Sequence, residues 1–412
     1  MGDGILTLPA DGTVRRAVSA TMSVICARAV RDFGDGMVVI LLPAYLTALG
    51  HSPAEIGLIA TAALLGSSLL TIAIGLLGAR QDQRRLLIAA SGLMFATGLA
   101  FASVDEFAVL VLIAFAGTAN PTAGNVSIFV PLEHTVLARG VADRDRTRLF
   151  ARYGLVGAMA AALGSLAAAS PEYLVRHGVG ELDALRAMFI VYAGLAVIGA
   201  AFYFRIPRLP PPPRDAPRAA LGPSRHIVYK LTALFSLDAF SGGFVVNSLI
   251  ALWLFERFDM SLASAGLFFF WTSLASAVSF PVAVWIARRI GLVNTMVFTH
   301  IPASLCLVVA AFTPSLAVVL GLLLVRAFLN QMDVPTRSSY VMAVVTEPER
   351  PAAASFTSVP RGLATAGAPA ITGALFAASY LALPLVIGGV LKISYDLLLL
   401  LMFRRVKPPE EL

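Results

Sequence analysis

Residues 54–104 read AEIGLIATAALLGSSLLTIAIGLLG, then ARQDQRR, then LLIAASGLMFATGLAFASV: two apolar runs around a short basic segment. Each run is about 20 residues long, the length of an α-helix that crosses the hydrocarbon core of a bilayer. Across the 412 residues, 58% are hydrophobic and 13% charged, and the mean hydropathy is +0.83. A soluble domain is nearer half apolar and a quarter charged. Because only helices and closed barrels satisfy the backbone in lipid, and barrel strands are only about 10 residues long, the sequence predicts an all-α membrane protein.

The same alternation of apolar runs with charged residues, Gly and Pro predicts twelve transmembrane helices. We place them near 20–49, 54–78, 86–104, 107–137, 148–169, 186–205, 228–255, 262–287, 293–312, 315–343, 352–378 and 381–403. The most polar internal stretch, 206–226, contains the run Pro210–Pro213 and is predicted to be an extended, solvated linker. We therefore expect an N-terminal six-helix bundle (1–205), a cytoplasmic proline-rich linker (206–226) and a C-terminal six-helix bundle (227–412).

The distribution of arginine predicts the orientation of the chain in the membrane. One set of loops, with both ends of the chain, holds nearly all the basic residues, whereas the opposite loops offer only Arg176, Arg186 and Arg257. The positive-inside rule then places both termini and the linker in the cytoplasm. Abundant Ala and Arg with little Lys favours a bacterial inner membrane. Nucleic-acid binding is not expected in spite of the net charge of +7, because the basic residues lie between spans rather than on one soluble face.

The two halves of the chain also resemble each other. Residues 79–85 follow the second span much as residues 287–291 follow the eighth, and 143–146 align with 347–350 at a similar offset. A duplicated six-span unit, with both copies facing the same way, is typical of parallel-repeat transporters.

The segment Gly75-Leu-Leu-Gly-Ala-Arg-Gln-Asp-Gln-Arg-Arg85 resembles the loop motif of the major facilitator superfamily, and the resemblance covers nearly the whole chain. It implies a secondary transporter whose loop helps to latch the two halves in the outward-facing state. The residues at the positions of this cytoplasmic gate motif are Gly75, Arg80, Asp82, Arg84 and Arg85, with Arg288 in the second copy, and Asp82 stands where the motif has its second Gly. The glycine is expected to let two helices approach closely. Because Ala79 and Ala287 occupy the motif's acidic position, a carboxylate latch is expected only if Asp82 replaces it.

The first span carries four ionisable residues, Arg28, Arg31, Asp32 and Asp35, whose spacing of i, i+3, i+4 and i+7 places them on one helical stripe. A charge at membrane depth is costly unless it is paired or faces a wet cavity. One interpretation is two internal ion pairs, Arg28–Asp32 and Arg31–Asp35, that neutralise one another. The interpretation that we favour is a cavity-lining site that binds solute, carries a proton or changes partners between states.

The tenth span repeats this pattern with Arg326, Asn330, Asp333 and Arg337. Arg337 is close enough to the cytoplasm for its side chain to snorkel. Arg326 is expected near mid-depth, where a permanently charged guanidinium can hold a carboxylate or phosphate. It is therefore the best single candidate for contact with solute or coupling ion.

Further polar residues at membrane depth occur in the fourth and seventh spans: Asn120, Asn125, Glu133, Asp238 and Asn247. The resemblance implies that spans one, four, seven and ten line a central cavity, and these are the spans that carry the polar groups. Asn120-Pro121 could instead be a helix break whose amide satisfies a freed carbonyl. Lys392 and Asp396, four apart in the twelfth span, are expected to form a structural pair, since the family keeps that helix peripheral.

No cofactor and no metal site are predicted. The five histidines lack ligand spacing, and the two cysteines and Trp253 and Trp271 are expected to pack or to lie at the membrane interface. The sequence contains no nucleophile elbow, zinc-protease motif or phosphate loop, so we do not expect an enzyme.

The sequence thus predicts a monomeric alternating-access transporter of a small solute in the lipid bilayer, with a proton or another ion as coupling partner. Asp32, Asp35, Glu133, Asp238 and Asp333 are candidate proton carriers. Mixed charge in the cavity slightly favours an anionic or zwitterionic solute. An exporter of amphipathic drugs or metabolites, or a transporter-like membrane sensor that does not transport, remain alternatives.

Overall fold

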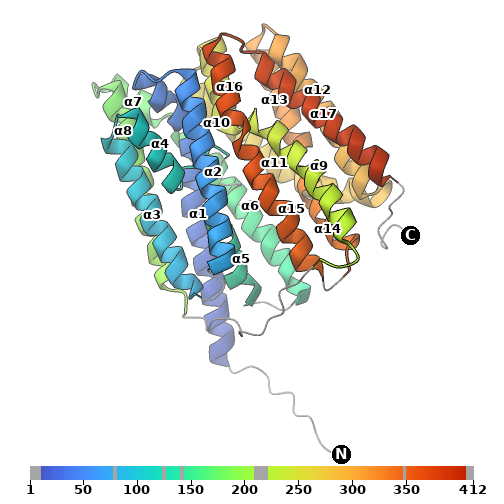
Figure 1. Ribbon diagram of the computed structural model, residues 1–412. Coiled ribbons are helices and arrows are strands. Elements are labelled where there is room, and N and C mark those ends of the chain that lie inside the picture. Colours follow the sequence, from blue (N-terminus) through green and yellow to red (C-terminus); the bar gives the residue numbers. More distant parts are fainter. Residues whose placement is uncertain are drawn as a thin grey trace, which may run out of the picture.

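A computed structural model describes residues 11–77, 81–122, 127–139, 143–207, 221–346 and 349–404. Within these ranges the regular secondary structure is helical and no strand occurs, as the composition predicts (Figure 1). The N-terminal half contains α1 (Asp11–Ala48), α2 (Pro53–Leu77), α3 (Gln83–Ser103), α4 (Phe107–Ala116), α5 (Phe129–Arg139), α6 (Asp143–Ala167), α7 (Ser170–Arg176) and α8 (Glu181–Phe204).

The C-terminal half contains α9 (Arg225–Gly243), α10 (Asn247–Phe258), α11 (Leu262–Ile290), α12 (Leu292–Phe312), α13 (Leu316–Asn330), α14 (Asp333–Ala343), α15 (Arg350–Ala366), α16 (Ala368–Ala377) and α17 (Leu383–Phe403). These helices build the twelve predicted spans in two six-span bundles. Most spans are single helices, whereas spans four, seven, ten and eleven each consist of two helices in line: α4–α5, α9–α10, α13–α14 and α15–α16. Most of the predicted linker, residues 208–220, lies outside the described residues.

By length and composition, nine helices of the described part could cross a membrane. The spans that fail this test are the first, the fourth and the eleventh. The first, α1, carries the charged stripe, while α4 has only ten residues and span eleven is interrupted at Gly367. A test based on hydropathy and helix length therefore does not recognise the first span because of its charged residues, or the fourth and eleventh because their helices are interrupted.

The breaks in spans four and seven meet between the two halves. Span four leaves the helix at Gly117, and the Asn120 side-chain oxygen accepts hydrogen bonds from Thr122 N (2.8 Å) and from the Thr122 hydroxyl (2.6 Å). The predicted break is therefore present, with the Asn120 oxygen as an acceptor in these bonds. In span seven, Ser248 N, just after the break, donates to the Pro121 carbonyl at 3.1 Å. Irregular backbone at membrane depth is tolerated because it is buried in protein.

Glycines let helix backbones touch within and between the halves. In the N-terminal half, Gly164 of α6 packs directly on the Phe33 carbonyl of α1. Between the halves, Gly57 of α2 packs on Gly373 of α16, and a Cβ at Gly57 would lie 2.5 Å from the Pro369 carbonyl oxygen. Small residues permit this close approach, which supplies the packing that holds helices together in lipid.

Two hydrogen bonds between the halves lie toward one end of the molecule. We call the end where α1 begins and α17 ends the terminal face, which points down and to the right in Figure 1, and the other end the distal face. Hydrogen bonds from Ala370 N to the Thr61 hydroxyl (2.9 Å) and from Ala263 N to the Glu172 carboxylate (3.1 Å) join the halves. Both lie toward the distal face.

Candidate functional site: a charged cavity between the two bundles

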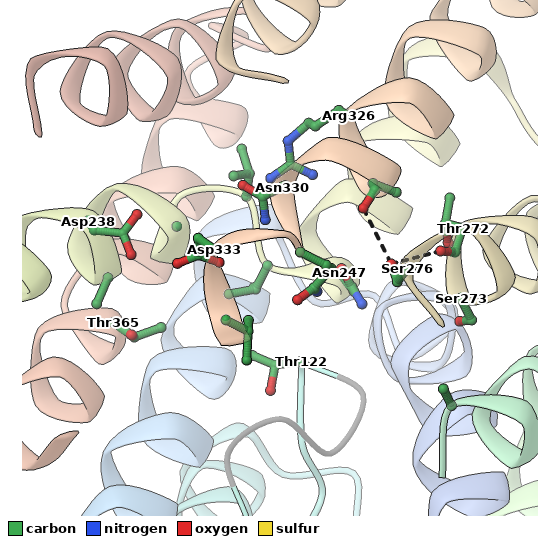
Figure 2. A pocket seen from close by; sticks show the side chains of 18 of the residues that line it. Thr122, Asp238, Asn247, Thr272, Ser273, Ser276, Arg326, Asn330, Asp333 and Thr365 are labelled. Atoms are coloured by element: carbon green, nitrogen blue, oxygen red, sulfur yellow. Dashed lines mark hydrogen bonds between the residues drawn. The ribbon is translucent and has the colours of Figure 1, made fainter. Parts of the chain in front are cut away.

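A cavity of about 470 Å³ lies between the two halves and is lined by both of them. Its polar lining comprises Arg28, Asp32, Thr122, Asp238, Ser241, Asn247, Thr272, Ser273, Ser276, Ser304, Arg326, Asn330, Gln331, Asp333, Arg337, Arg361, Thr365 and Lys392. Figure 2 shows Arg326 and Asn330 together, with Asp238 and Asp333 on one side and Thr272, Ser273 and Ser276 on the other. The volume is in the range of pockets that enclose small organic molecules.

The structure brings most of the predicted site residues to this cavity. Those that line it are Arg28, Asp32, Asp238, Asn247, Arg326, Asn330, Asp333 and Arg337. Four others, Arg31, Asp35, Asn120 and Glu133, are buried in the N-terminal half outside the lining. Asn125 lies outside the described residues.

A buried polar cluster in the N-terminal half is centred on Glu133 of α5. Arg31 Nη1 lies 2.9 Å from one Glu133 oxygen, which also accepts a hydrogen bond from the Tyr203 hydroxyl at 2.5 Å. The Tyr153 hydroxyl donates to the other oxygen and accepts from Arg28 at 3.0 Å. Both carboxylate oxygens are therefore satisfied inside the bundle, as burial of a charge requires.

One of the two ion pairs predicted within the first span is wrong. Arg28 does pair with Asp32, but Arg31 pairs with Glu133 and, at 3.2 Å, with Asp32 rather than with Asp35. The i+4 spacing allows an Arg31–Asp35 pair, but the Glu133 carboxylate of α5 and the adjacent Asp32 carboxylate lie closer to Arg31. Asp35 instead accepts a long, 3.5 Å hydrogen bond from the Tyr192 hydroxyl.

The C-terminal half holds a second, larger cluster around Asp238 of α9. One Asp238 oxygen lies 2.5 Å from Lys392 Nζ, and the other lies 3.3 Å from Arg361 and 3.5 Å from Arg337. Arg337 also pairs with Asp333 one turn earlier in α14. Asp333 in turn lies 3.5 Å from His300 Nε2.

Two expectations about this half are therefore wrong. The Arg337 side chain is buried between two carboxylates, so it does not snorkel to an aqueous boundary. Lys392 pairs with Asp238 and lines the cavity, so it does not form the predicted pair with Asp396, whose carboxylate contacts His300 at 3.2 Å instead. Helical spacing put Lys392 and Asp396 on one face of α17, but the opposing helices supply closer partners.

Arg361, His300 and the two tyrosines that contact Glu133 are not among the site residues predicted from the sequence. Arg361 and His300 lie inside predicted spans, so the rule that each ionisable group at membrane depth needs an explanation would have selected both. The tyrosines carry no comparable signal, because a tyrosine in a span is ordinary. Among the described residues, no group of three or more His, Cys, Asp or Glu side chains could hold a metal ion.

Arg326 differs from the other cations of the cavity. Arg28, Arg337, Arg361 and Lys392 each lie within 4.0 Å of a carboxylate. No carboxylate of the described residues lies that close to Arg326, which projects into the cavity beside Asn330 (Figure 2). It lies ten residues into α13, roughly 15 Å along the helix, which is about half the thickness of a bilayer's hydrocarbon core.

The loop motif after the second span is only partly described, because Arg80 lies outside the described residues. No described atom lies within 4 Å of a Cβ built on Gly75, so the predicted close approach there is wrong. Asp82 caps α3 by accepting a hydrogen bond from Arg84 N at 3.0 Å, and the Arg84 guanidinium lies 5.9 Å from the centre of the Phe204 ring. Arg85 and Arg288 are exposed.

Comparisons with known proteins agree with this architecture. The chain is 23% identical over 399 residues to the uncharacterized membrane protein YJR124C of Saccharomyces cerevisiae, covering 88% of this chain and 89% of the yeast protein. The nucleoside transporter NupG is similar in structure, with a TM-score of 0.73, 14% identity, and coverage of 93% of this chain and 99% of NupG. A bacterial homolog of the human lysosomal transporter Spinster, in an inward-facing and unoccupied conformation, gives a TM-score of 0.68 at 13% identity, covering 94% of this chain and 95% of the homolog.

At 13–14% sequence identity, the similarity to these solved structures is evidence for the fold alone. The sequence profile of the Major Facilitator Superfamily, however, matches residues 24–236 and 231–412, which together are nearly the whole chain. With two six-span bundles around one central cavity, this chain belongs to the Major Facilitator Superfamily and is an integral membrane transporter.

Proposed function

We propose that this chain is a secondary active transporter that moves a small anionic or zwitterionic solute by alternating access, with the proton as coupling ion. The observation that supports an anionic group on the solute is the unequal pairing of charges around the cavity. The lining carboxylates Asp32, Asp238 and Asp333 all have cationic partners, whereas Arg326 has none among the described residues. The unbalanced lining charge of the described cavity is therefore positive.

A guanidinium near mid-membrane is costly unless something anionic or polar solvates it. Its planar fork binds a carboxylate or phosphate through two parallel hydrogen bonds. The hydroxyls of Thr272, Ser273 and Ser276 and the amide of Asn330 surround the same space and could hold the uncharged parts of a solute (Figure 2). A small solute with one acidic group fits this combination.

We also propose that the termini lie in the cytoplasm of a bacterial inner membrane, on the strength of the arginine distribution. The distal contacts between the halves, including the Thr61–Ala370 hydrogen bond, would then close the outer side of the cavity. A closed outer side is consistent with an inward-facing member of an alternating-access cycle.

Purified protein can be screened by thermal shift against matched panels of organic anions, zwitterions and cations. Arg326→Gln is expected to abolish stabilisation by the anionic hits, while Arg289→Gln, which removes an exposed arginine stacked on Trp285, leaves it unchanged. A panel that yields only cations, or anions that still stabilise Arg326→Gln, would contradict the solute class.

A measurement of solute flux distinguishes a transporter from a transporter-like sensor that only binds its ligand. Anionic hits are then tested for uptake into proteoliposomes with and without an imposed pH gradient. We expect accumulation that depends on the gradient and on Arg326. Binding without flux would favour the transporter-like sensor, and flux that ignores the gradient would remove the proton as coupling ion.

A further inference from the structure

His300 of α12 is fully buried behind the cavity and does not line it. Its ring Nδ1 lies 3.2 Å from an Asp396 carboxylate oxygen on α17. Its Nε2 lies 3.3 Å from the Asn330 backbone carbonyl and 3.5 Å from Asp333, a residue of the cavity wall. Both nitrogens of one imidazole therefore face oxygen atoms.

These contacts require one more proton than a neutral His300 imidazole and an ionised Asp396 carboxylate hold together. A neutral imidazole has one N–H and one bare nitrogen, and a bare nitrogen that faces an anionic or carbonyl oxygen is repelled. The Asn330 carbonyl can only accept, so Nε2 must donate. At Nδ1 the contact is favourable only if a proton lies between Nδ1 and Asp396, whichever of the two atoms carries it.

The surroundings of Asp396 agree with a bound proton. Its side chain is fully buried, and its second oxygen, Oδ2, has no hydrogen-bond partner among the described residues. A permanently ionised carboxylate would leave that oxygen charged, buried and unsatisfied. Sharing a proton with His300 removes the net charge of the pair.

We propose that His300 and Asp396 form a proton-binding site whose occupancy is coupled to the solute cavity. The link runs through the break of span ten, because Asn330 is the last residue of α13 and Asp333 the first of α14. Loss of the proton puts a bare nitrogen against either Asp396 or the Asn330 carbonyl, so one of these contacts must open. The proton state thereby acts on the segment that carries Arg326, Asn330 and Asp333 into the cavity.

The charges that face His300 set the direction of this coupling. Asp333 of α14 and Asp396 of α17 contact His300 directly. Asp333 belongs to a linked set of ion pairs with Arg337 of α14, Asp238 of α9, Arg361 of α15 and Lys392 of α17, and the Tyr395 ring lies 6.3 Å from the His300 ring. Among these described groups, the cluster carries one net positive charge when the pair holds its proton and none when the proton leaves. A positive cluster beside Arg326 favours an anionic solute, and by linkage a bound anion favours the proton. Proton and anion would then bind from the same side and cross together.

The proton site can be tested without any solute. Full-length protein with 15N-labelled histidine is reconstituted in lipid bilayers, and its ring nitrogens are observed by solid-state NMR at neutral pH. Of the five histidines, one is expected to show two protonated or proton-sharing nitrogens, and His300→Gln removes that signal. Asp396→Asn, which cannot hold the proton, is expected to convert the signal to a neutral imidazole.

His134→Gln is the matched control in the other bundle, where the ring packs on Phe150 and Tyr153 with centroids 4.7 and 5.2 Å apart. It should leave the His300 signal intact. If His300→Gln does not fold, the wild-type spectrum and Asp396→Asn still decide the matter. A wild-type His300 with a ring nitrogen that neither carries nor shares a proton at neutral pH, or a signal unchanged by Asp396→Asn, would overturn the proposal.

The coupling between the His300–Asp396 proton and the solute cavity rests on the proposed function. It is measured separately, with the organic anions that stabilise the protein in the thermal-shift panel. Their affinity should fall on the order of tenfold when the pair loses its proton at alkaline pH, and His300→Gln should abolish this dependence. Wild-type affinity that ignores pH would overturn the coupling. If no anion binds, the proposed function fails, while the NMR result still decides whether the proton site exists.

Discussion

The Arg31–Glu133 ion pair joins α1 to α5 inside the N-terminal bundle, away from the cavity lining. Its side chains are 4% and 0% exposed, and two tyrosine hydroxyls complete the hydrogen bonds of Glu133. Removing one partner of such a pair leaves a buried charge and typically costs about 3–5 kcal/mol, whereas replacing both partners with apolar residues is often nearly neutral. Its position therefore indicates a structural role rather than contact with solute.

We accordingly expect Glu133→Leu to lower the free energy of unfolding in detergent by about 3–5 kcal/mol. The double variant Arg31→Leu/Glu133→Leu should be less destabilised than the sum of the two single variants, because neither buried charge is left facing the position of the other. Denaturant unfolding of the four proteins measures the difference. Strictly additive effects would show that the two side chains do not interact.

Glu349 makes the clearest pH-dependent contact outside the spans. Its carboxylate accepts hydrogen bonds from the Ser224 hydroxyl (2.6 Å), the Thr346 hydroxyl (2.5 Å), Gly222 N and Ser224 N (3.3 Å). These bonds, the Ser224 hydroxyl first, lower the pKa of Glu349 from its ordinary 4.5 to about 2. Since the folded pKa is depressed, the stabilisation is complete above about pH 4.5 and is lost as the pH falls toward 2.

Glu349→Gln is therefore expected to lower the thermal unfolding temperature at pH 7, and the difference from wild type should shrink as the pH falls below 4.5. Glu256→Gln, at an exposed position near the end of α10, serves as the control and should change little at any pH. A Glu349→Gln deficit that stays constant down to pH 3 would show that the carboxylate's charge is not what matters.

At the scale of one element, α6 offers two glycines in opposite surroundings. A Cβ at Gly164 would overlap the Phe33 carbonyl of α1, whereas a Cβ at Gly154 would have no described atom within 4 Å. Gly164→Ala must push two helix backbones apart, and we expect it to destabilise the protein by about 1–3 kcal/mol. Gly154→Ala should be neutral or slightly stabilising, since alanine is the better helix former. Thermal unfolding of the two variants makes the comparison, and equal effects would contradict the packing of α1 on α6.

The elements were largely predictable, because a span in lipid must be a long apolar helix and the loops between spans are marked by arginine. The charged stripe of α1 and the polar face of span ten could also be seen, since a helical period fixes which residues share a face. A period does not say which neighbouring helix that face meets. Arg31 therefore pairs with Glu133 instead of the predicted Asp35, and Lys392 pairs with Asp238 instead of the predicted Asp396.

On the scale of the whole molecule, the seal between the halves depends on small residues near the distal face. Gly57 and Gly373 lie backbone to backbone, and the Thr61 hydroxyl accepts a hydrogen bond from Ala370 N one helical turn away. In an alternating-access cycle this contact exists in one conformation and is absent from the other. A side chain at Gly57 therefore penalises one conformation and leaves the other almost unaffected.

We expect Gly57→Val to open the distal face. An overpacking penalty of about 1–3 kcal/mol on the closed seal would shift a two-state population by roughly 5- to 150-fold. Spin labels at Tyr173→Cys and Tyr380→Cys, both exposed near that face and introduced after replacement of Cys26 and Cys306, report the separation of the halves by pulsed electron resonance. A longer-distance population should appear in Gly57→Val and be absent from Gly194→Val, where no described atom lies within 4 Å of a new Cβ. Identical distance distributions in the two variants would mean that the α2–α16 contact does not move, and the halves would then have to separate elsewhere.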